Sequence, residues 1–156
     1  MSNIFDISEF ESFEKDLIKL ANDVMPKECK KFIRTQGNKL KKTTLAAAKS
    51  SVNAKNGRYH NSIKRGKVYK YRGNGAWAIR VYSSDPKAHL IEDGHRIITR
   101  GKGKKAKKHY TKENGGKECG FVPGKKVFKK SQQSFKSIFD SDVEKFIDNV
   151  IVGGIK

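Results

Sequence analysis

The sequence predicts an α+β fold in which a long N-terminal helix and a C-terminal helix pack on a small, mostly antiparallel sheet beside a mobile basic loop. Apolar residues recur at helical spacing near both ends of the chain, while β-branched and aromatic residues gather in the middle. At 156 residues the chain has the length of a single domain. We expect four regions in order: a helical region at 1–55; a loop, a β-hairpin and a short helix at 56–99; a flexible basic loop at 100–120; and the C-terminal helix at 121–156.

The N-terminal helix is predicted from a stripe of apolar residues spaced three or four positions apart. Ser8 and Glu11 have the spacing of a capping box at its start. Pro26 interrupts the helix but can open a second segment, which we expect to break again at Gly37. A thinner apolar stripe continues as far as Ala47. The first stripe consists of Phe10, Phe13, Leu17, Leu20 and Val24.

The middle of the chain predicts a loop followed by a β-hairpin. The stretch "NAKNGRYHNS" has no apolar period and is typical of a loop. The stretches "VYKY" and "AWAIRVYSS" favour strands, with Asn74-Gly75 at the turn between them. Successive side chains point to opposite faces, so one face of the second strand would be core and the other partly solvated. Trp77, Ile79 and Val81 would share one face, and Ala78, Arg80 and Tyr82 the other.

The stretch "SSDPKAHLIEDGH" predicts a helix of two turns. Asp85 would be its N-cap, Pro86 would lie in its first turn, and Gly94 would end it. The following "RIITR" could be a strand, whereas residues 101 to 120 have almost no apolar side chains to bury. Apolar residues from Val127 to Val150 then predict the C-terminal helix, with a bend near 140–142.

Two histidines and two acidic residues in "AHLIEDGH" raise the question of a metal or acid-base site. His89 and Glu92 would share a helix face, with Asp93 beside them, while His95 would fall beyond the helix end. The two histidines of a zincin must lie four apart on an unbroken helix, and that pattern is absent. The alternatives are a metal-dependent nuclease and a capped helical turn, and we expect the capped turn, without a bound metal.

Strong positive charge suggests a polyanionic partner. The formal net charge is +19, and residues 1 to 25 are net negative by four, which leaves +23 for the rest of the chain. A flexible loop that is dense in basic residues can contact phosphates without reading sequence. A solvated loop, or a loop docked on an acidic protein, accounts for the basic residues equally well. The candidate contact residues are Arg100, Lys102, Lys104, Lys105, Lys107 and Lys108.

Other function classes find no support in the sequence. The chain has no apolar run long enough for a membrane span and no basic-then-apolar leader, so we expect neither a membrane protein nor a secreted precursor. Cys29 and Cys119 lie far apart without other metal ligands at zinc spacing, which favours free thiols in a reducing compartment.

Three short motifs occur in an order that resembles a known family. They are "GRYHNSI" at 57–63 after the long helix, "AHLIEDG" at 88–94 after the hairpin, and "VPGKKVFKKS" at 122–131 before the last helix. This order is similar to that of the small head-to-tail joining and tail-completion proteins of tailed bacteriophages. The chain departs from the family pattern at His95, where a small hydroxyl residue is commoner, and in the longer gap between Pro123 and Phe128.

The resemblance implies a non-enzymatic structural protein with an α+β fold and without a cofactor. Such a protein would form a ring, expected to be a hexamer, at the neck or the head-proximal end of the tail. It would be assembled in the bacterial cytoplasm and located in the virion, with neck and tail proteins (connector, tail tube or sheath) as neighbours and DNA in the lumen. Glu92 is the candidate subunit contact. The alternative functions are a sequence-independent DNA-binding protein and the nuclease.

Overall fold

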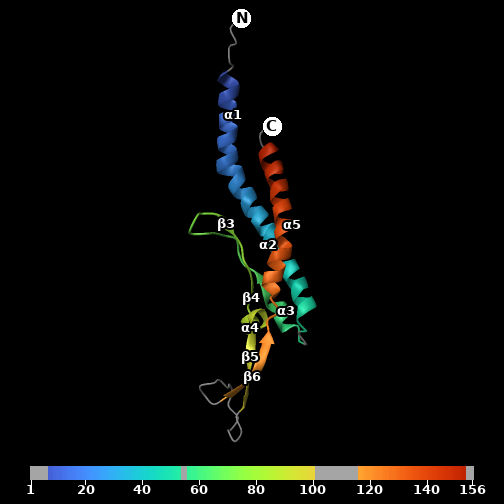
Figure 1. Ribbon diagram of the computed structural model, residues 1–156. Helices are drawn as coiled ribbons and strands as arrows, with labels where there is room; N and C mark the ends of the chain where they lie inside the picture. Colours follow the sequence, from blue (N-terminus) through green and yellow to red (C-terminus); the bar gives the residue numbers. More distant parts are fainter. Residues whose placement is uncertain (1–6, 54–55, 101–115, 154–156) are drawn as a thin grey trace.

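The computed structural model describes residues 7–53, 56–100 and 116–153, and it has an α+β fold (Figure 1). Two long helices lie side by side, and two extended β-ribbons project from them. The elements in order are α1 (Ile7–Lys19), a π-helical turn η1 (Leu20–Val24), α2 (Met25–Ser51), α3 (Arg58–Ser62), β1 (Ile63–Arg65), β2 (Tyr69–Lys70), β3 (Trp77–Ala78), β4 (Val81–Ser83), α4 (Ala88–Asp93), β5 (Gly94–Arg100), β6 (Gly116–Pro123), α5 (Val127–Ile147) and a second π-helical turn η2 (Asp148–Val152).

Helices α2 and α5 run antiparallel and are joined by aromatic and polar contacts. The Phe32 ring stacks on Phe146 with centroids 4.6 Å apart. Asp142 on α5 accepts hydrogen bonds from Gln36 at 2.8 Å and Lys39 at 2.5 Å. These bonds, led by the one from Lys39, lower the pKa of Asp142 below its ordinary value. Helix α5 is continuous through residues 140–142, so the predicted bend there is wrong.

The predicted break at Gly37 is also wrong, because α2 passes through this position without interruption. A Cβ at Gly37 would lie 2.5 Å from Cδ1 of Ile79, so this glycine allows the hairpin to pack against the helix. The irregularity expected near Met25 is the π-helical turn η1, which ends just before it. Pro26 has no N–H to donate to the preceding turn, which accounts for the irregular hydrogen bonding there.

Strands β1 to β4 form one interrupted hairpin, which confirms the predicted hairpin and its turn. Strand β1 pairs with β4, and β2 pairs with β3 nearer the tip. Tyr71 N–H donates to the Ala76 carbonyl at 2.8 Å, which closes the turn that contains Asn74 and Gly75. Trp77, Ile79 and Val81 are partly buried, and on the other face Arg80 and Tyr82 are exposed while Ala78 is partly buried.

The second ribbon corrects two of the predicted boundaries. Residues 116–123 form β6, which pairs antiparallel with β5 from Gly94 opposite Pro123 to Arg100 opposite Gly116. The flexible loop therefore does not extend to residue 120, and the C-terminal helix begins at Val127 rather than at 121. Ladder hydrogen bonds with β5 satisfy the backbone of a segment whose side chains bury little. Residues 101–115 lie outside the described residues.

The core lies where the hairpin, α4 and the end of α2 meet the start of α5. Its fully buried members are Ala48, Tyr59, Ile63 and Val127. The predicted loop at 53–62 is wrong in part, because residues 58–62 form the helical turn α3. Gly57, at φ +61°, permits the left-handed backbone that precedes this turn, and the turn delivers Tyr59 to the core.

Candidate functional site

The three sequence motifs meet at one junction, where α3, α4 and the start of α5 come together (Figure 1). Helix α4 begins at Ala88, two residues later than a helix capped by Asp85 would begin. The Asp85 carboxylate instead accepts a hydrogen bond from the N–H of Lys87 at 2.8 Å, forming a turn before the helix. Gly94, at φ +86°, ends α4 as predicted, and His95 lies in β5 beyond the helix.

Glu92 caps the N-terminus of α5 across the junction. Its Oε2 accepts a hydrogen bond from the backbone N–H of Phe128 at 3.0 Å, and its Oε1 accepts one from Lys129 at 3.1 Å. These groups lie in the first turn of α5, where the cap residue Lys126 offers no side-chain acceptor of its own. A carboxylate there also opposes the positive end of the helix dipole. The expected subunit contact through Glu92 stays a prediction, but both carboxylate oxygens already bind within the chain.

Backbone contacts lock the two sides of the junction together. Lys125 N–H donates to the Ile91 carbonyl at 2.7 Å, and Lys126 N–H donates to the Glu92 carbonyl at 3.2 Å. The Lys126 ammonium also contacts the Asp93 carboxylate at 2.8 Å. The approach is so close that a Cβ at Gly124 would lie 2.6 Å from the carbonyl carbon of Asp93. The motifs at 88–94 and 122–131 are therefore two halves of one structural unit.

Tyr59 from the first motif lies buried against this unit, with a relative exposure of 4%. Its hydroxyl has no hydrogen-bond partner among the described residues. Burial, with smaller contributions from the charges of Glu92 and Asp85, raises the pKa of Tyr59 to about 12. Arg58, next to it, forms an ion pair with Asp85 at 3.6 Å. The charges of Glu92 in the second motif and of Asp85 before it therefore act on a side chain of the first motif.

A groove of about 590 Å³ runs beside the junction, between α4 and the β5–β6 ribbon. Its apolar residues are Val52, Leu90, Ile91, Val122 and Pro123. Basic side chains also line it: Lys87, His95 and Lys125. A groove lined by apolar and basic side chains suits an amphipathic helix that carries acidic residues. This groove, which we call the junction groove, is the candidate site for contact with another subunit.

The four residues considered for metal or acid-base chemistry do not converge. Glu92 binds the start of α5, Asp93 pairs with Lys126, and His95 lies opposite Val122 in the ribbon. His89 is exposed on α4. Within the described part of the chain, no three His, Cys, Asp or Glu side chains are grouped closely enough to hold a metal ion.

Of the candidate polyanion contacts, the structure describes Arg100, which lies at the far end of the β5–β6 ribbon. Arg100 is the last residue of β5, opposite Gly116 of β6. The other candidates, Lys102, Lys104, Lys105, Lys107 and Lys108, lie outside the described residues. The ribbon therefore holds both ends of the basic segment at a point remote from the helices (Figure 1).

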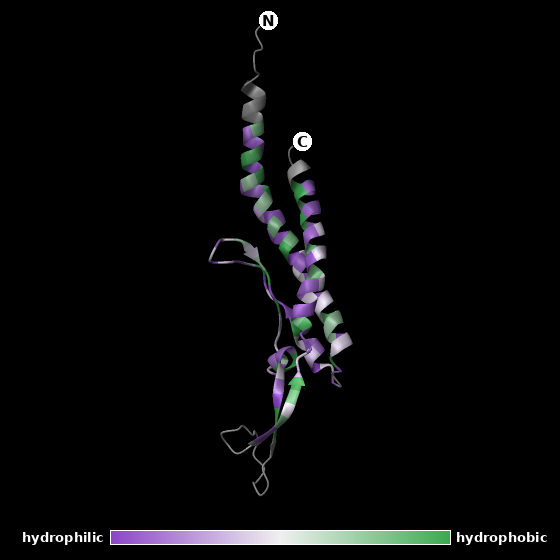
Figure 2. Cartoon of the chain, viewed as in Figure 1, coloured by the Kyte–Doolittle hydropathy of each residue, from purple (hydrophilic) through white to green (hydrophobic). Residues whose placement is uncertain are grey.

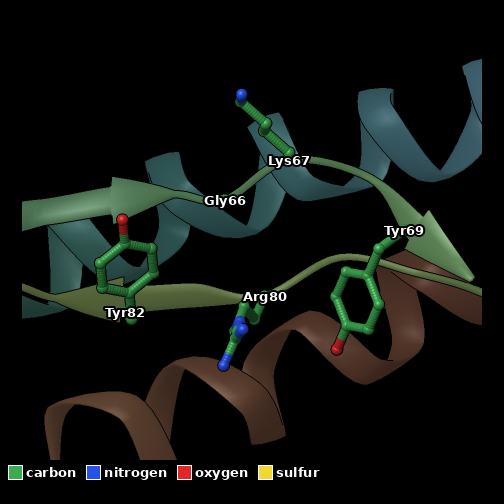
Figure 3. Close-up of a pocket in the computed structure, with 5 residues that line it drawn as sticks. All are labelled: Gly66, Lys67, Tyr69, Arg80 and Tyr82. Carbon is green, nitrogen blue, oxygen red and sulfur yellow. The ribbon is translucent and has the colours of Figure 1, made fainter. Parts of the chain in front are cut away.

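Sequence reasoning missed a second cationic surface on the hairpin. A groove there, also of about 590 Å³, is lined by Gly66, Lys67, Tyr69, Arg80 and Tyr82 (Figure 3). The signal that could have revealed it is the distribution of charge, since no acidic residue occurs between Glu28 and Asp85. The density of lysine predicted a polyanion contact at residues 100–108 instead.

Comparison with protein-family models, with curated proteins and with solved structures finds no match. None of the helices in the described segments has the length and apolar character needed to cross a membrane.

Replacing Glu92 with alanine should lower the free energy of unfolding by about 1–2 kcal/mol, because two N–H groups of α5 lose their acceptor. Urea denaturation of the dilute protein would measure the change. Glu144→Ala is a matched control, because it removes an exposed carboxylate from α5 away from the junction. It should change stability by less than about 0.5 kcal/mol. Equal effects of the two substitutions would show that the cap contributes nothing.

Proposed function

We propose that this protein is a non-enzymatic structural subunit of a tailed bacteriophage or phage-like particle. It forms a ring at the neck or the head-proximal end of the tail, where it completes the tail or joins it to the head. The observation that supports this most is the junction, because the motifs that resemble the tail-completion family form a single packed unit. A motif pair that folds as a unit is a better basis for the resemblance than two unrelated short matches.

The exposed apolar surface supports an assembled rather than a solitary chain. Among the described residues, only six apolar side chains are buried, while twelve large ones are exposed. Several of the exposed ones lie on α1, which extends past the end of α5 (Figure 1). Figure 2 shows apolar and hydrophilic residues alternating around this helix. Such a helix gains stability when a neighbour covers its apolar side. The exposed residues of this region are Phe13, Leu17, Ile18 and Val24.

Charge complementarity supports a second copy of the chain as the partner of α1. Residues 1 to 25 are net negative, whereas the junction groove is lined by Lys87, His95 and Lys125 together with apolar residues. We therefore place α1 of one subunit in the junction groove of the next. This contact joins two different surfaces, so repeating it produces a ring when the rotation closes. A ring of this kind agrees with the tail-completion role.

The test is complementation of particles made without the protein. Their images should show free heads and tails, or tails of the wrong length, and the wild-type protein should restore joined particles. Leu17→Asp should not restore them, because the charge would enter an apolar contact. The Leu17→Asp variant should have the mass of the 17.6 kDa monomer in solution under conditions where the wild type forms a larger species.

The matched control is Lys19→Gln, which changes the net charge by the same amount on the side of the helix away from Leu17. It should assemble and complement like the wild type. Charge reversal provides a second check. Glu14→Lys should weaken assembly, and adding Lys87→Glu and Lys125→Glu to that variant should restore assembly. Normal infectious particles in the absence of the protein would overturn the proposed function.

A second candidate function is sequence-independent DNA binding. It is favoured by the net charge of +23 after residue 25 and by the ribbon that holds both ends of the basic segment. Counterion release would make such binding weaken steeply with salt. The binding experiment described below includes a variant of this segment.

A further inference from the structure

We propose that the outer face of the β1–β4 hairpin binds single-stranded nucleic acid. In this site, phosphates contact Lys67 and Arg80 while bases stack on Tyr69 and Tyr82. The site lies on a different ribbon from residues 100–108, and it does not depend on the ring proposal.

The hairpin is cationic without compensating acidic residues. Between Ile63 and Ser83 the sequence has six lysines and arginines and no aspartate or glutamate. No carboxylate in the described segments forms an ion pair with any of the six. The charge is therefore available for an external anion. The six are Lys64, Arg65, Lys67, Lys70, Arg72 and Arg80.

A shift in strand register brings tyrosines and cations onto the same face. Near the base of the hairpin, Lys64 pairs with Tyr82; near the tip, Tyr69 pairs with Ala78. One strand therefore has an extra residue within 66–68, as in a β-bulge. Paired residues share a face, and alternate residues do too, so Tyr69 lies on the face of Arg80 and Tyr82. Without the shift, Tyr69 would pair with Trp77 and point to the other face.

The inner face of the hairpin is occupied, which leaves the outer face for a ligand. Ile79 packs against Gly37 of α2, and Trp77 lies beneath the ammonium groups of Lys30 and Lys70 at 5.5 and 5.3 Å. On the outer face, Tyr69 and Tyr82 are 38% and 43% exposed. Substitutions on that face should therefore leave the core intact.

The groove on the outer face combines a cation with exposed aromatic rings. Along the ribbon, Arg80 lies between Tyr82 and Tyr69 (Figure 3). Its guanidinium is 5.7 Å from the Tyr69 ring centroid, so the arginine is held near the aromatic surface. Gly66 opposite presents no side chain, and the five lining residues enclose about 590 Å³. This volume accommodates one base with its phosphate.

These features favour unpaired bases over other anions. Single-stranded nucleic acid binds where aromatic rings stack with bases and basic groups follow the backbone. In a duplex the bases are already stacked on one another, so the tyrosine rings would have no base faces to contact. An acidic protein surface would use the cations and leave the tyrosines without a role. The pairing of tyrosines with a central arginine therefore points to a single strand.

The test is fluorescence anisotropy with a labelled oligothymidylate of about 16 nucleotides, the upper site size for comparable surfaces. The double variant Tyr69→Leu/Tyr82→Leu should raise Kd at least about tenfold, because it removes both stacking surfaces. Arg80→Gln should weaken binding and reduce the salt slope by about one. The controls are Tyr71→Leu in the exposed turn and Lys42→Gln on α2, which should bind like the wild type. The fluorescence of Trp77, the only tryptophan of the chain, reports whether each variant is folded.

Three results would overturn the inference. In the first, the hairpin variants bind normally, while neutralising Lys102, Lys104, Lys105, Lys107 and Lys108 together abolishes binding; the contact is then the basic segment. In the second, a duplex of equal length binds as tightly as the single strand and neither responds to the tyrosine changes. In the third, polyglutamate binds as tightly as the oligonucleotide and responds equally to all hairpin variants, which identifies an acidic protein surface.

Discussion

Replacing Gly124 with alanine should destabilise the fold by about 3 kcal/mol, the upper range for overpacking a close contact. The new methyl group would lie 2.6 Å from the carbonyl carbon of Asp93 and 2.7 Å from the backbone nitrogen of Gly94. Backbone atoms on both sides of the junction would have to move, unlike the end of a flexible side chain. The hydrogen bonds from Lys125 and Lys126 to α4 would lengthen as they did so.

Urea denaturation would measure this change at a concentration where the protein is monomeric, because assembly adds to apparent stability. Gly66→Ala is the matched control. Its methyl group would meet the Arg80 carbonyl oxygen at 3.4 Å, an ordinary contact distance. A loss of less than about 1 kcal/mol is expected there. If Gly124→Ala cost no more than the control, the junction would be looser than its contacts indicate.

Replacing Tyr59 with alanine should cost about 3–5 kcal/mol, while replacing it with phenylalanine should change stability by about 1 kcal/mol or less. The ring is buried beside Ile63 and Val127, so its loss leaves a cavity in the core. The hydroxyl has no partner in the described residues, so its removal gives up no hydrogen bond found there. A large loss in Tyr59→Phe would show that the hydroxyl has a stabilising partner.

Tyr59 also makes stability depend on pH in the alkaline range. Its pKa is about 12 in the folded protein, against 10.0 for a tyrosine side chain in water. Between these values the unfolded chain releases the tyrosine proton and the folded chain retains it, so stability falls as pH rises. Below pH 10 this contribution is fully present. Ultraviolet absorbance titration should show a late phenolate phase in the wild type and none in Tyr59→Phe.

The spacing and type of neighbouring residues were sufficient to predict the long helices and the hairpin. Helical spacing predicted the two long helices, and the β-branched and aromatic stretches predicted the hairpin. The failures came from tertiary context. Gly37 has a poor helix propensity, but Ile79 from a distant strand occupies the space that it leaves. Residues 116–120 bury little, but pairing with β5 gives them ladder hydrogen bonds that hydropathy does not register.

The candidate site shows the same division. The end of α4 at Gly94 and the position of His95 beyond it follow from the spacing of "AHLIEDGH". The bond from Glu92 to α5 joins residues 36 and 37 positions apart, and no local rule indicates which helix a lone carboxylate will cap. The hairpin groove depends on a single extra residue in one strand, and its effect on side-chain direction is visible only when the register is known.

The β5–β6 ribbon begins and ends at the same place, because Gly94 pairs with Pro123 beside the junction. The two described strands of the ribbon therefore start side by side at this pair and extend together away from the helices (Figure 1). Adding one residue to each strand would lengthen the ribbon by about 3.3 Å, while the Gly94–Pro123 pair would stay in place. The length of the ribbon could therefore change by the addition of paired residues to β5 and β6 without any change in the core residues.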